Sequence, residues 1–213
     1  AEAARVIAGI FSQENLTQRP TTTAVTDLVY RGLRHWGLAK VRLQRLASRE
    51  PDLLLQGLLA VAWSALADKR RADYVVVDEA VAAAKQLAGQ GSAGFVNALL
   101  RKTLANAALA AADWHQLMAR YNAPLWWIQK IQADYKDEAD AVLSALAARA
   151  GLTVRLAGRF AERPKDYLEM LAAAGLQGTL VGPVAVRVSP PVGVDRLPGF
   201  SEGLVSVQDA AAQ

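Results

Sequence analysis

The stretch VDEAVAAAKQLAGQGSAGFVNALLRKTL, residues 77–104, decides the fold, because two helical patterns flank a glycine-rich turn within it. The first pattern extends from about Tyr74 to Leu87, with Asp73 as a candidate N-cap. Gly89 and Gly91 are suited to ending that helix. Ser92 is a candidate cap for the next helix, AGFVNALLRKTL. The alanines of both stretches indicate closely packed helices.

Helical spacing continues outward on both sides of this stretch. Toward the N-terminus, apolar residues recur at i, i+3, i+4 and i+7 within 6–11 and 25–36. Further helices are predicted at 41–46 and 51–66, with Pro51 in a first turn. The apolar run 53–67 is shorter than the roughly 18 residues that span a bilayer, which predicts a buried core helix. Toward the C-terminus, helices are predicted at 113–121 and from Pro124 to about 150.

The last third of the chain has a different pattern. Strand-like runs occur at 152–156 (LTVRL), 184–188 (VAVRV) and 204–207 (LVSV). Between the first two runs, a helix is predicted to begin at Pro164 and to end at Gly175. We therefore predict a mainly α protein, with a helical bundle followed by a small α+β domain and a boundary near residue 145.

Composition excludes several classes of protein. Of the 213 residues, 53% are hydrophobic and none is cysteine, which excludes disulfides, thiolate metal sites and a cysteine nucleophile within this sequence. His35 and His115 are 80 residues apart and lack metal-ligand spacing, so we expect no metal. The glycine-rich piece 89–94 matches no phosphate-binding loop, which favours a tight turn between helices. The N-terminal AEAARVIAGIF has no secretion signal, so we expect a cytoplasmic protein without a membrane partner.

Positive charge is concentrated between Leu28 and Arg49, a 22-residue segment without an acidic residue. On helices, Arg31 and Arg34 would share one face, and Arg42 and Arg45 another. Smaller clusters occur at 69–71 and at Arg101–Lys102. Such clusters can bind the phosphates of a nucleic acid, but because the net charge of +4 is modest, solvated helix faces are the favoured interpretation of the clusters taken alone.

An aromatic cluster of Tyr121, Trp126 and Trp127 surrounds Pro124. It could provide stacking faces for unpaired bases or pack where the helical and α+β domains meet, and the second interpretation is the more common for such a pair.

Four motifs in order resemble a known family. VDEAVAAAKQLAGQGSAGFVNALLRKTL and DLVYRGLR (27–34) resemble helices of NusB-type RNA-binding domains. YNAPLWWIQKIQADY (121–135) and LPGFSEGLVSVQDAAAQ (197–213) resemble segments of the RsmB-type ribosomal RNA cytosine-C5 methyltransferases, where the second leads into the catalytic domain. One departure is Ala157, where that family commonly has Asn, and another is the short connection at 12–22.

The resemblance implies a NusB-like domain at 1–120, a connecting helix at 121–145 and a small α+β domain at 146–213. It also implies that the S-adenosylmethionine-binding loop and the catalytic cysteines would lie beyond Gln213. Because that reaction requires a cysteine thiolate, this chain is expected to bind RNA but not to catalyse methyl transfer alone. It is expected to hold no cofactor itself, with S-adenosylmethionine bound by the catalytic domain.

The partners implied are small-subunit ribosomal RNA and the chain's own C-terminal catalytic domain. The expected RNA contacts are Arg31, Arg34, Arg42, Arg45, Arg101, Lys102, Arg155 and Arg159. A stand-alone NusB-like antitermination or ribosome-assembly factor is the alternative, although such a protein would end near residue 145. A helical interaction domain without a nucleic-acid partner is a third possibility.

Overall fold

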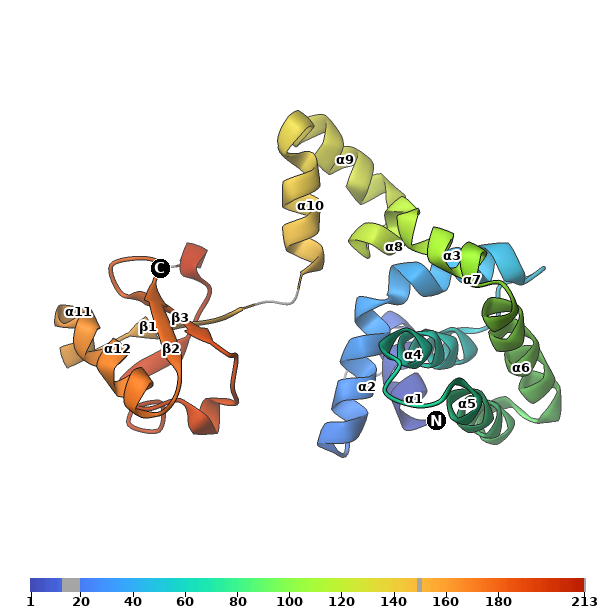
Figure 1. The fold of residues 1–213 in the computed structure, drawn as a ribbon, viewed down its shortest axis with the longest axis horizontal. Helices are drawn as coiled ribbons and strands as arrows, with labels where there is room; N and C mark the ends of the chain where they lie inside the picture. Colours follow the sequence, from blue (N-terminus) through green and yellow to red (C-terminus); the bar gives the residue numbers. More distant parts are fainter. Residues whose placement is uncertain (13–19, 149–150, 213) are drawn as a thin grey trace. The chain divides into compact units, whose positions relative to one another are not determined.

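The computed structural model describes residues 1–12, 20–148 and 151–212. The chain divides into two compact units, residues 1–148 and 149–213. The first is helical and the second is a small α+β unit, as the sequence predicts (Figure 1). Most of the connection at 12–22 lies outside the described residues.

The helical unit contains ten described α-helices and two short 3-10 turns; α7 has no predicted counterpart, and the helix predicted at 113–121 is divided into η1 and α8. Their bounds are α1 (Glu2–Ser12), α2 (Thr23–Arg34), α3 (Trp36–Leu46), α4 (Leu53–Asp68), α5 (Asp73–Ala88), α6 (Gln90–Ala105), α7 (Ala107–Ala112), η1 (Asp113–His115), α8 (Leu117–Tyr121), α9 (Leu125–Tyr135), η2 (Lys136–Glu138) and α10 (Ala139–Ala147).

Helix α4 forms the centre of this unit, as its apolar sequence predicts, and packs against α1, α2, α5 and α6. Leu59 and Trp63 of α4 are fully buried. The indole Nε1 of Trp63 donates a hydrogen bond to Thr103 Oγ1 on α6 at 3.1 Å, so the polar atom of this core aromatic is satisfied. None of the described helices is both long and apolar enough to cross a membrane.

Three predicted helix starts are wrong by one to three residues. Pro51 lies before α4, because Asp52 is the N-cap and its carboxylate accepts a hydrogen bond from the Leu55 amide at 2.9 Å. Asp73 is the first residue of α5 and not its cap. Helix α6 begins before Ser92, because Gly89 at φ +82° makes the whole turn between the two helices.

The long helix predicted from Pro124 to about residue 150 is broken into α9 and α10. Lys136 stands at the break with φ +46° and ψ −113°, a backbone conformation that favours glycine. The break lets the two helices fold back on each other around the buried side chains of Ile128, Ile131 and Leu143.

The second unit is a four-stranded antiparallel sheet with the order β2-β3-β1-β4. Three strands match the predicted runs, and β2 was not predicted. The elements are β1 (Leu152–Leu156), α11 (Arg159–Glu162), α12 (Pro164–Ala173), β2 (Gln177–Leu180), β3 (Ala185–Ser189), η3 (Val194–Arg196), β4 (Val205–Val207) and η4 (Ala210–Ala212).

Helices α11 and α12 lie on one face of this sheet (Figure 1). That face contributes Val154, Val186 and Val188 to a core with Tyr167 and Leu171 of α12. Strand β2 approaches α12 so closely that a Cβ atom on Gly178 would lie 2.7 Å from side chains of that helix. The glycine that weakens the strand signal in the sequence is therefore required by the packing.

Candidate nucleic-acid interface

The basic segment 28–49 is divided between α2 and α3, and acidic residues from elsewhere neutralise most of it. Arg31 pairs with Asp27 on its own helix at 2.6 Å and also with Asp68 at the end of α4. Lys40 pairs with Glu50 and Arg45 pairs with Asp113. The absence of acidic residues between positions 28 and 49 therefore leaves few of its cations unpaired, because acids on either side of the segment in sequence pair with Arg31, Lys40, Arg42 and Arg45.

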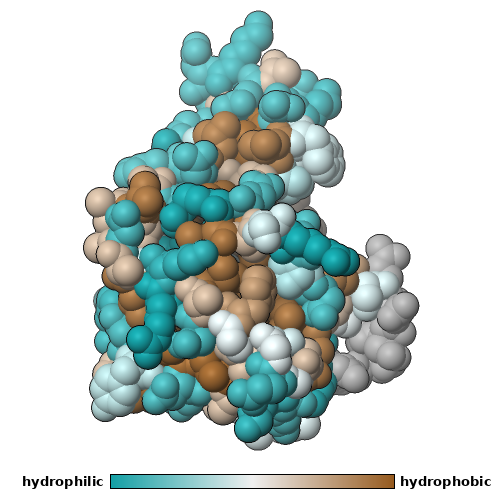
Figure 2. Space-filling model, turned by 90° about the vertical axis from the view of Figure 1, so that its right-hand side faces the viewer, coloured by the Kyte–Doolittle hydropathy of each residue, from teal (hydrophilic) through white to brown (hydrophobic). Residues whose placement is uncertain are grey.

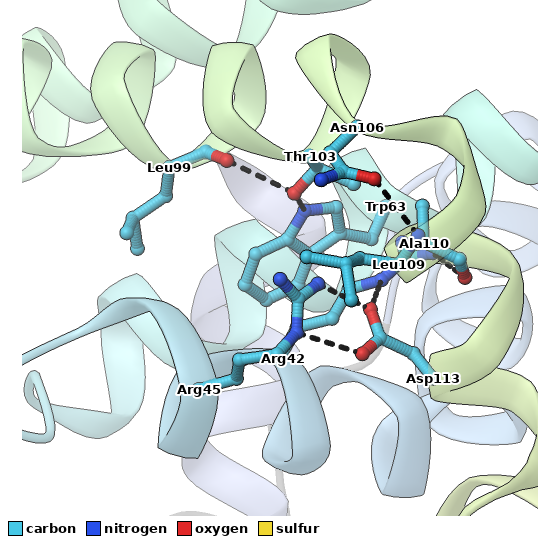
Figure 3. Close-up of polar contacts among 9 residues, drawn as sticks. All are labelled: Arg42, Arg45, Trp63, Leu99, Thr103, Asn106, Leu109, Ala110 and Asp113. Carbon is cyan, nitrogen blue, oxygen red and sulfur yellow. Dashed lines mark hydrogen bonds and ion pairs between the residues drawn. The ribbon is translucent and has the colours of Figure 1, made fainter.

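Arg42 is buried and is not positioned to contact RNA, which corrects the prediction for this residue (Figure 3). Its Nε donates to Asp113 Oδ2 at 3.2 Å, its Nη2 donates to the Ala110 carbonyl at 3.3 Å, and its guanidinium lies over the ring of Trp63. Burial lowers the pKa of Arg42, and the hydrogen bond that Arg42 donates to Asp113 opposes that shift. Arg42 therefore joins α3 to α7 and η1 as a structural residue.

Arg45 also pairs with Asp113 and is closer to solvent than Arg42. Its Nε and Nη2 donate to the two carboxylate oxygens of Asp113 at 2.8 and 2.6 Å, a bidentate arrangement. The Arg45 side chain retains 29% exposure, whereas that of Asp113 retains 4%. Arg45 therefore reaches solvent, but Asp113 already holds its guanidinium.

Arg34 is the member of the predicted α2 pair whose charge is available. It is exposed, its guanidinium lies 5.8 Å from the ring centroid of Tyr30, and it has no acidic partner among the described residues. Tyr30 is itself 55% exposed. The two side chains together present a cation and an aromatic face, the combination that contacts phosphates and bases in RNA-binding surfaces.

Arg101 and Lys102 lie exposed near the end of α6. The Arg101 Nε donates to Asn97 Oδ1 one turn earlier at 3.1 Å, and neither cation pairs with an acid in the described part of the chain. Helices α2 and α6 lie on different sides of α4 in Figure 1. The structure therefore does not unite the predicted cations of α2 and α6 in one patch.

The third cluster, residues 69–71, is neutralised by neighbouring acids. Lys69 pairs with Asp73 at 2.9 Å, Arg70 with Asp68 at 3.0 Å and Arg71 with Glu79 at 2.7 Å.

Figure 2 shows one side of the molecule, where hydrophobic patches alternate with hydrophilic side chains without forming a continuous apolar face.

The three aromatic residues around Pro124 differ in their exposure to solvent. Tyr121 is buried and donates its hydroxyl hydrogen bond to Asp140, so its ring is not available for stacking. Trp126 and Trp127 are 67% and 37% exposed and meet edge to face, with ring centroids 5.7 Å apart. The two indoles are the most accessible tryptophans in the described part of the helical unit.

His35 has a structural setting. Its Nδ1 lies 3.0 Å from the hydroxyl of buried Ser64, and its ring meets Trp114 edge to face. Burial, followed by the nearby charge of Arg34, lowers the pKa of His35, so the imidazole is neutral at pH 7.

In the second unit, Arg155 of β1 is exposed on the sheet face opposite the helices. Arg159 begins α11, and its guanidinium lies 4.9 Å from the ring centroid of Phe160 in the core. Sequence reasoning missed Arg187 of β3, which is also exposed. The alternation of VAVRV already places Arg187 on the face opposite the valines, so period-two spacing could have revealed it.

Comparison with protein families identifies the two units. Residues 3–105 match the NusB family, and residues 123–195 match the ferredoxin-like domain of RsmF/B-like methyltransferases. The chain therefore joins a NusB-type helical domain to a ferredoxin-like domain. The second match includes α9 and α10, which pack within the helical unit in the structure.

Longer proteins are similar to this chain across both of its units. The chain is 30% identical to ribosomal RNA small subunit methyltransferase B of Xylella fastidiosa, over 99% of this chain and 51% of that protein. It is 33% identical to a probable methyltransferase of the same name from Coxiella burnetii, over 66% of this chain and 33% of that protein. The chain resembles the N-terminal half of these proteins and spans about half the length of the first.

A solved structure has the same fold at low identity. The crystal structure of PH0851 superposes with a TM-score of 0.62 and 16% identity, over 99% of this chain and 53% of that one. The fold of this chain therefore recurs in a distant protein.

Proposed function

We propose that this chain is the RNA-engaging N-terminal region of an S-adenosylmethionine-dependent small-subunit ribosomal RNA cytosine-C5 methyltransferase. The observation that carries the proposal is the similarity of 99% of the chain to the Xylella methyltransferase. The match to a methyltransferase ferredoxin-like domain at 123–195 favours this function over a stand-alone NusB-like factor. A cytoplasmic location follows from the proposed substrate.

Binding and catalysis are separated in this proposal. The chemistry of cytosine-C5 methylation requires a cysteine thiolate, and the 213 residues contain none. We therefore assign RNA binding to this chain, and the methyl donor and the reacting thiolate to the catalytic domain that accompanies it. Its partners are then ribosomal RNA and that domain.

The RNA contacts proposed in the helical unit are the cations without acidic partners, Arg34, Arg101 and Lys102. Arg31 and Arg45 would contact phosphates only by exchanging a carboxylate for a phosphate, so we expect smaller contributions from them. Arg155 and Arg159 are the proposed contacts in the second unit. Arg42 is not included, because it is buried against Asp113.

Variants that neutralise these cations test the proposal. Arg34→Gln and the double variant R101Q/K102Q should each weaken binding to a small-subunit ribosomal RNA hairpin and reduce its salt dependence by about one phosphate per cation. Lys85→Gln is the matched control, because Lys85 is an exposed cation of α5 outside the proposed contacts. Equal losses for all three variants would mean that net charge alone drives binding, and unchanged binding in the first two would contradict the assignment.

A further inference from the structure

The open face of the sheet in the second unit differs in chemistry from the face covered by helices. Strand register and burial place Thr153 and Arg155 of β1 on the open face, together with Arg187 of β3. The remaining side chains on this face are small or uncharged, namely Gln177, Thr179, Ala185, Ser189 and Ser206. Neither an acidic nor an aromatic side chain belongs to this face in the described strands.

The two arginines on this face are neighbours. In the β1–β3 ladder Arg155 is paired with Ala185, and Arg187 is two residues further along β3, opposite Thr153. Side chains in this diagonal relationship start roughly 7 Å apart, so both arginines can reach phosphates of the same RNA strand. Two like charges this close repel each other, and negatively charged phosphates nearby offset that repulsion.

Both guanidinium groups are available to a ligand. Arg155 and Arg187 are exposed, and neither forms an ion pair with any residue that the structure describes. The acids of this unit lie in its helices, turns and loops, outside the four strands, at Glu162, Asp166, Glu169, Asp195, Glu202 and Asp209. Within the four strands, the charged residues are therefore only Arg155 and Arg187, and both are positive.

We infer that this open face, through Arg155 and Arg187, binds the phosphate backbone of the RNA without reading its bases. This inference rests on the proposed function and deepens it. The guanidinium groups would hold two phosphates, and the hydroxyl and amide side chains around them are ordinary hydrogen-bond donors to phosphate and sugar oxygens. Because the face has no aromatic side chain, it lacks the stacking platform on which base recognition by sheets depends.

The test uses the whole chain with two RNAs of equal length, a labelled small-subunit ribosomal RNA hairpin and oligo(U), between about 50 and 300 mM KCl. The double variant R155Q/R187Q should reduce the slope of log K against log salt by about 1.4 to 1.8, the value for two phosphates. At 0.1 M salt this corresponds to binding about 25- to 60-fold weaker. The loss should lie within this range for both RNAs, with oligo(U) near the lower value and the paired hairpin near the upper one, since no base is read.

The matched control is R163Q/K165Q, which removes two exposed cations from the helical side of the same unit. It should leave the slope unchanged. R155K/R187K keeps both charges and should retain the wild-type slope, and circular dichroism with thermal unfolding should show that every variant is folded.

Three outcomes overturn the inference while the proposed function stands. The first is wild-type RNA binding with an unchanged slope in R155Q/R187Q, and the second is an equal loss in the R163Q/K165Q control. The third is a loss that differs strongly between the hairpin and oligo(U), which would mean that the face reads bases. Failure of the wild-type chain to bind either RNA would instead contradict the proposed function.

Discussion

Replacing Asp113 by alanine should lower the free energy of unfolding of the helical unit by more than removing an exposed ion-pair partner at its surface. Asp113 is 4% exposed and accepts hydrogen bonds from Arg42 and Arg45. Without the carboxylate, Arg42 remains buried and charged, because an arginine does not give up its proton. Breaking a buried ion pair from one side costs about 3 to 5 kcal/mol.

The cost should come almost entirely from Arg42. The Arg45 side chain is 29% exposed and can turn its charge toward water, whereas that of Arg42 is 5% exposed. Replacing both charges by apolar residues, as in R42M/D113L, should therefore recover most of the lost free energy of unfolding. Asp27→Ala is the surface control, because it removes one exposed partner of Arg31 and should cost about 0 to 1 kcal/mol.

Urea unfolding followed by tryptophan fluorescence measures these differences. All five tryptophans, at positions 36, 63, 114, 126 and 127, lie in the helical unit, so the signal reports on that unit alone. A loss below about 1 kcal/mol in D113A, or a loss in R42M/D113L as large as in D113A, would refute the reasoning.

Three further predictions follow from single sites. Gly37→Ala should lower the free energy of unfolding by about 1 to 3 kcal/mol or more, because a Cβ atom there would lie 1.8 Å from the Met118 carbonyl oxygen. Gly94 lies in open space on α6, so Gly94→Ala should raise the free energy of unfolding by about 0.5 to 1 kcal/mol. Urea unfolding measures both changes, and equal effects would contradict this prediction. Lys136→Gly should raise the free energy of unfolding by about 1 kcal/mol, because φ +46° with ψ −113° strains any residue that has a Cβ. A lower stability in that variant would show that the backbone is not strained there. Because the pKa of His35 is lowered in the folded protein, the unfolded chain takes up a proton first as the pH falls. The free energy of unfolding should therefore decline as the pH falls from about 6.5 toward the pKa of His35 in the folded state. His35→Gln should flatten this part of the plot of stability against pH, and an unchanged plot would exclude His35 as its source.

The helical unit could be predicted from sequence because its signals are local. Apolar spacing defined α1, α2 and α4, and Gly89 marked the turn between α5 and α6. The break at Lys136 could not be predicted, because the sequence between residues 125 and 150 contains no glycine or proline to mark it. Strand β2 could not be predicted either, since Gly178 is explained only by its contact with α12.

The candidate interface was less predictable, because the availability of a charge depends on distant partners. Arg42 lies in an acid-free segment, yet its partner Asp113 follows 71 residues later in the chain. Arg187 was overlooked for the opposite reason, because a single arginine in a strand gives no cluster signal. Only the sheet register brings it beside Arg155.

The central claim is that this chain binds ribosomal RNA through unpaired cations and does not transfer a methyl group alone. The most direct test measures the affinity of the wild-type chain for a small-subunit ribosomal RNA hairpin across a salt series, with labelled S-adenosylmethionine in the same reactions. We expect a log–log slope of roughly −0.7 to −0.9 for each phosphate bound and no label in the RNA. No binding at low salt, or incorporation of the label, would contradict it.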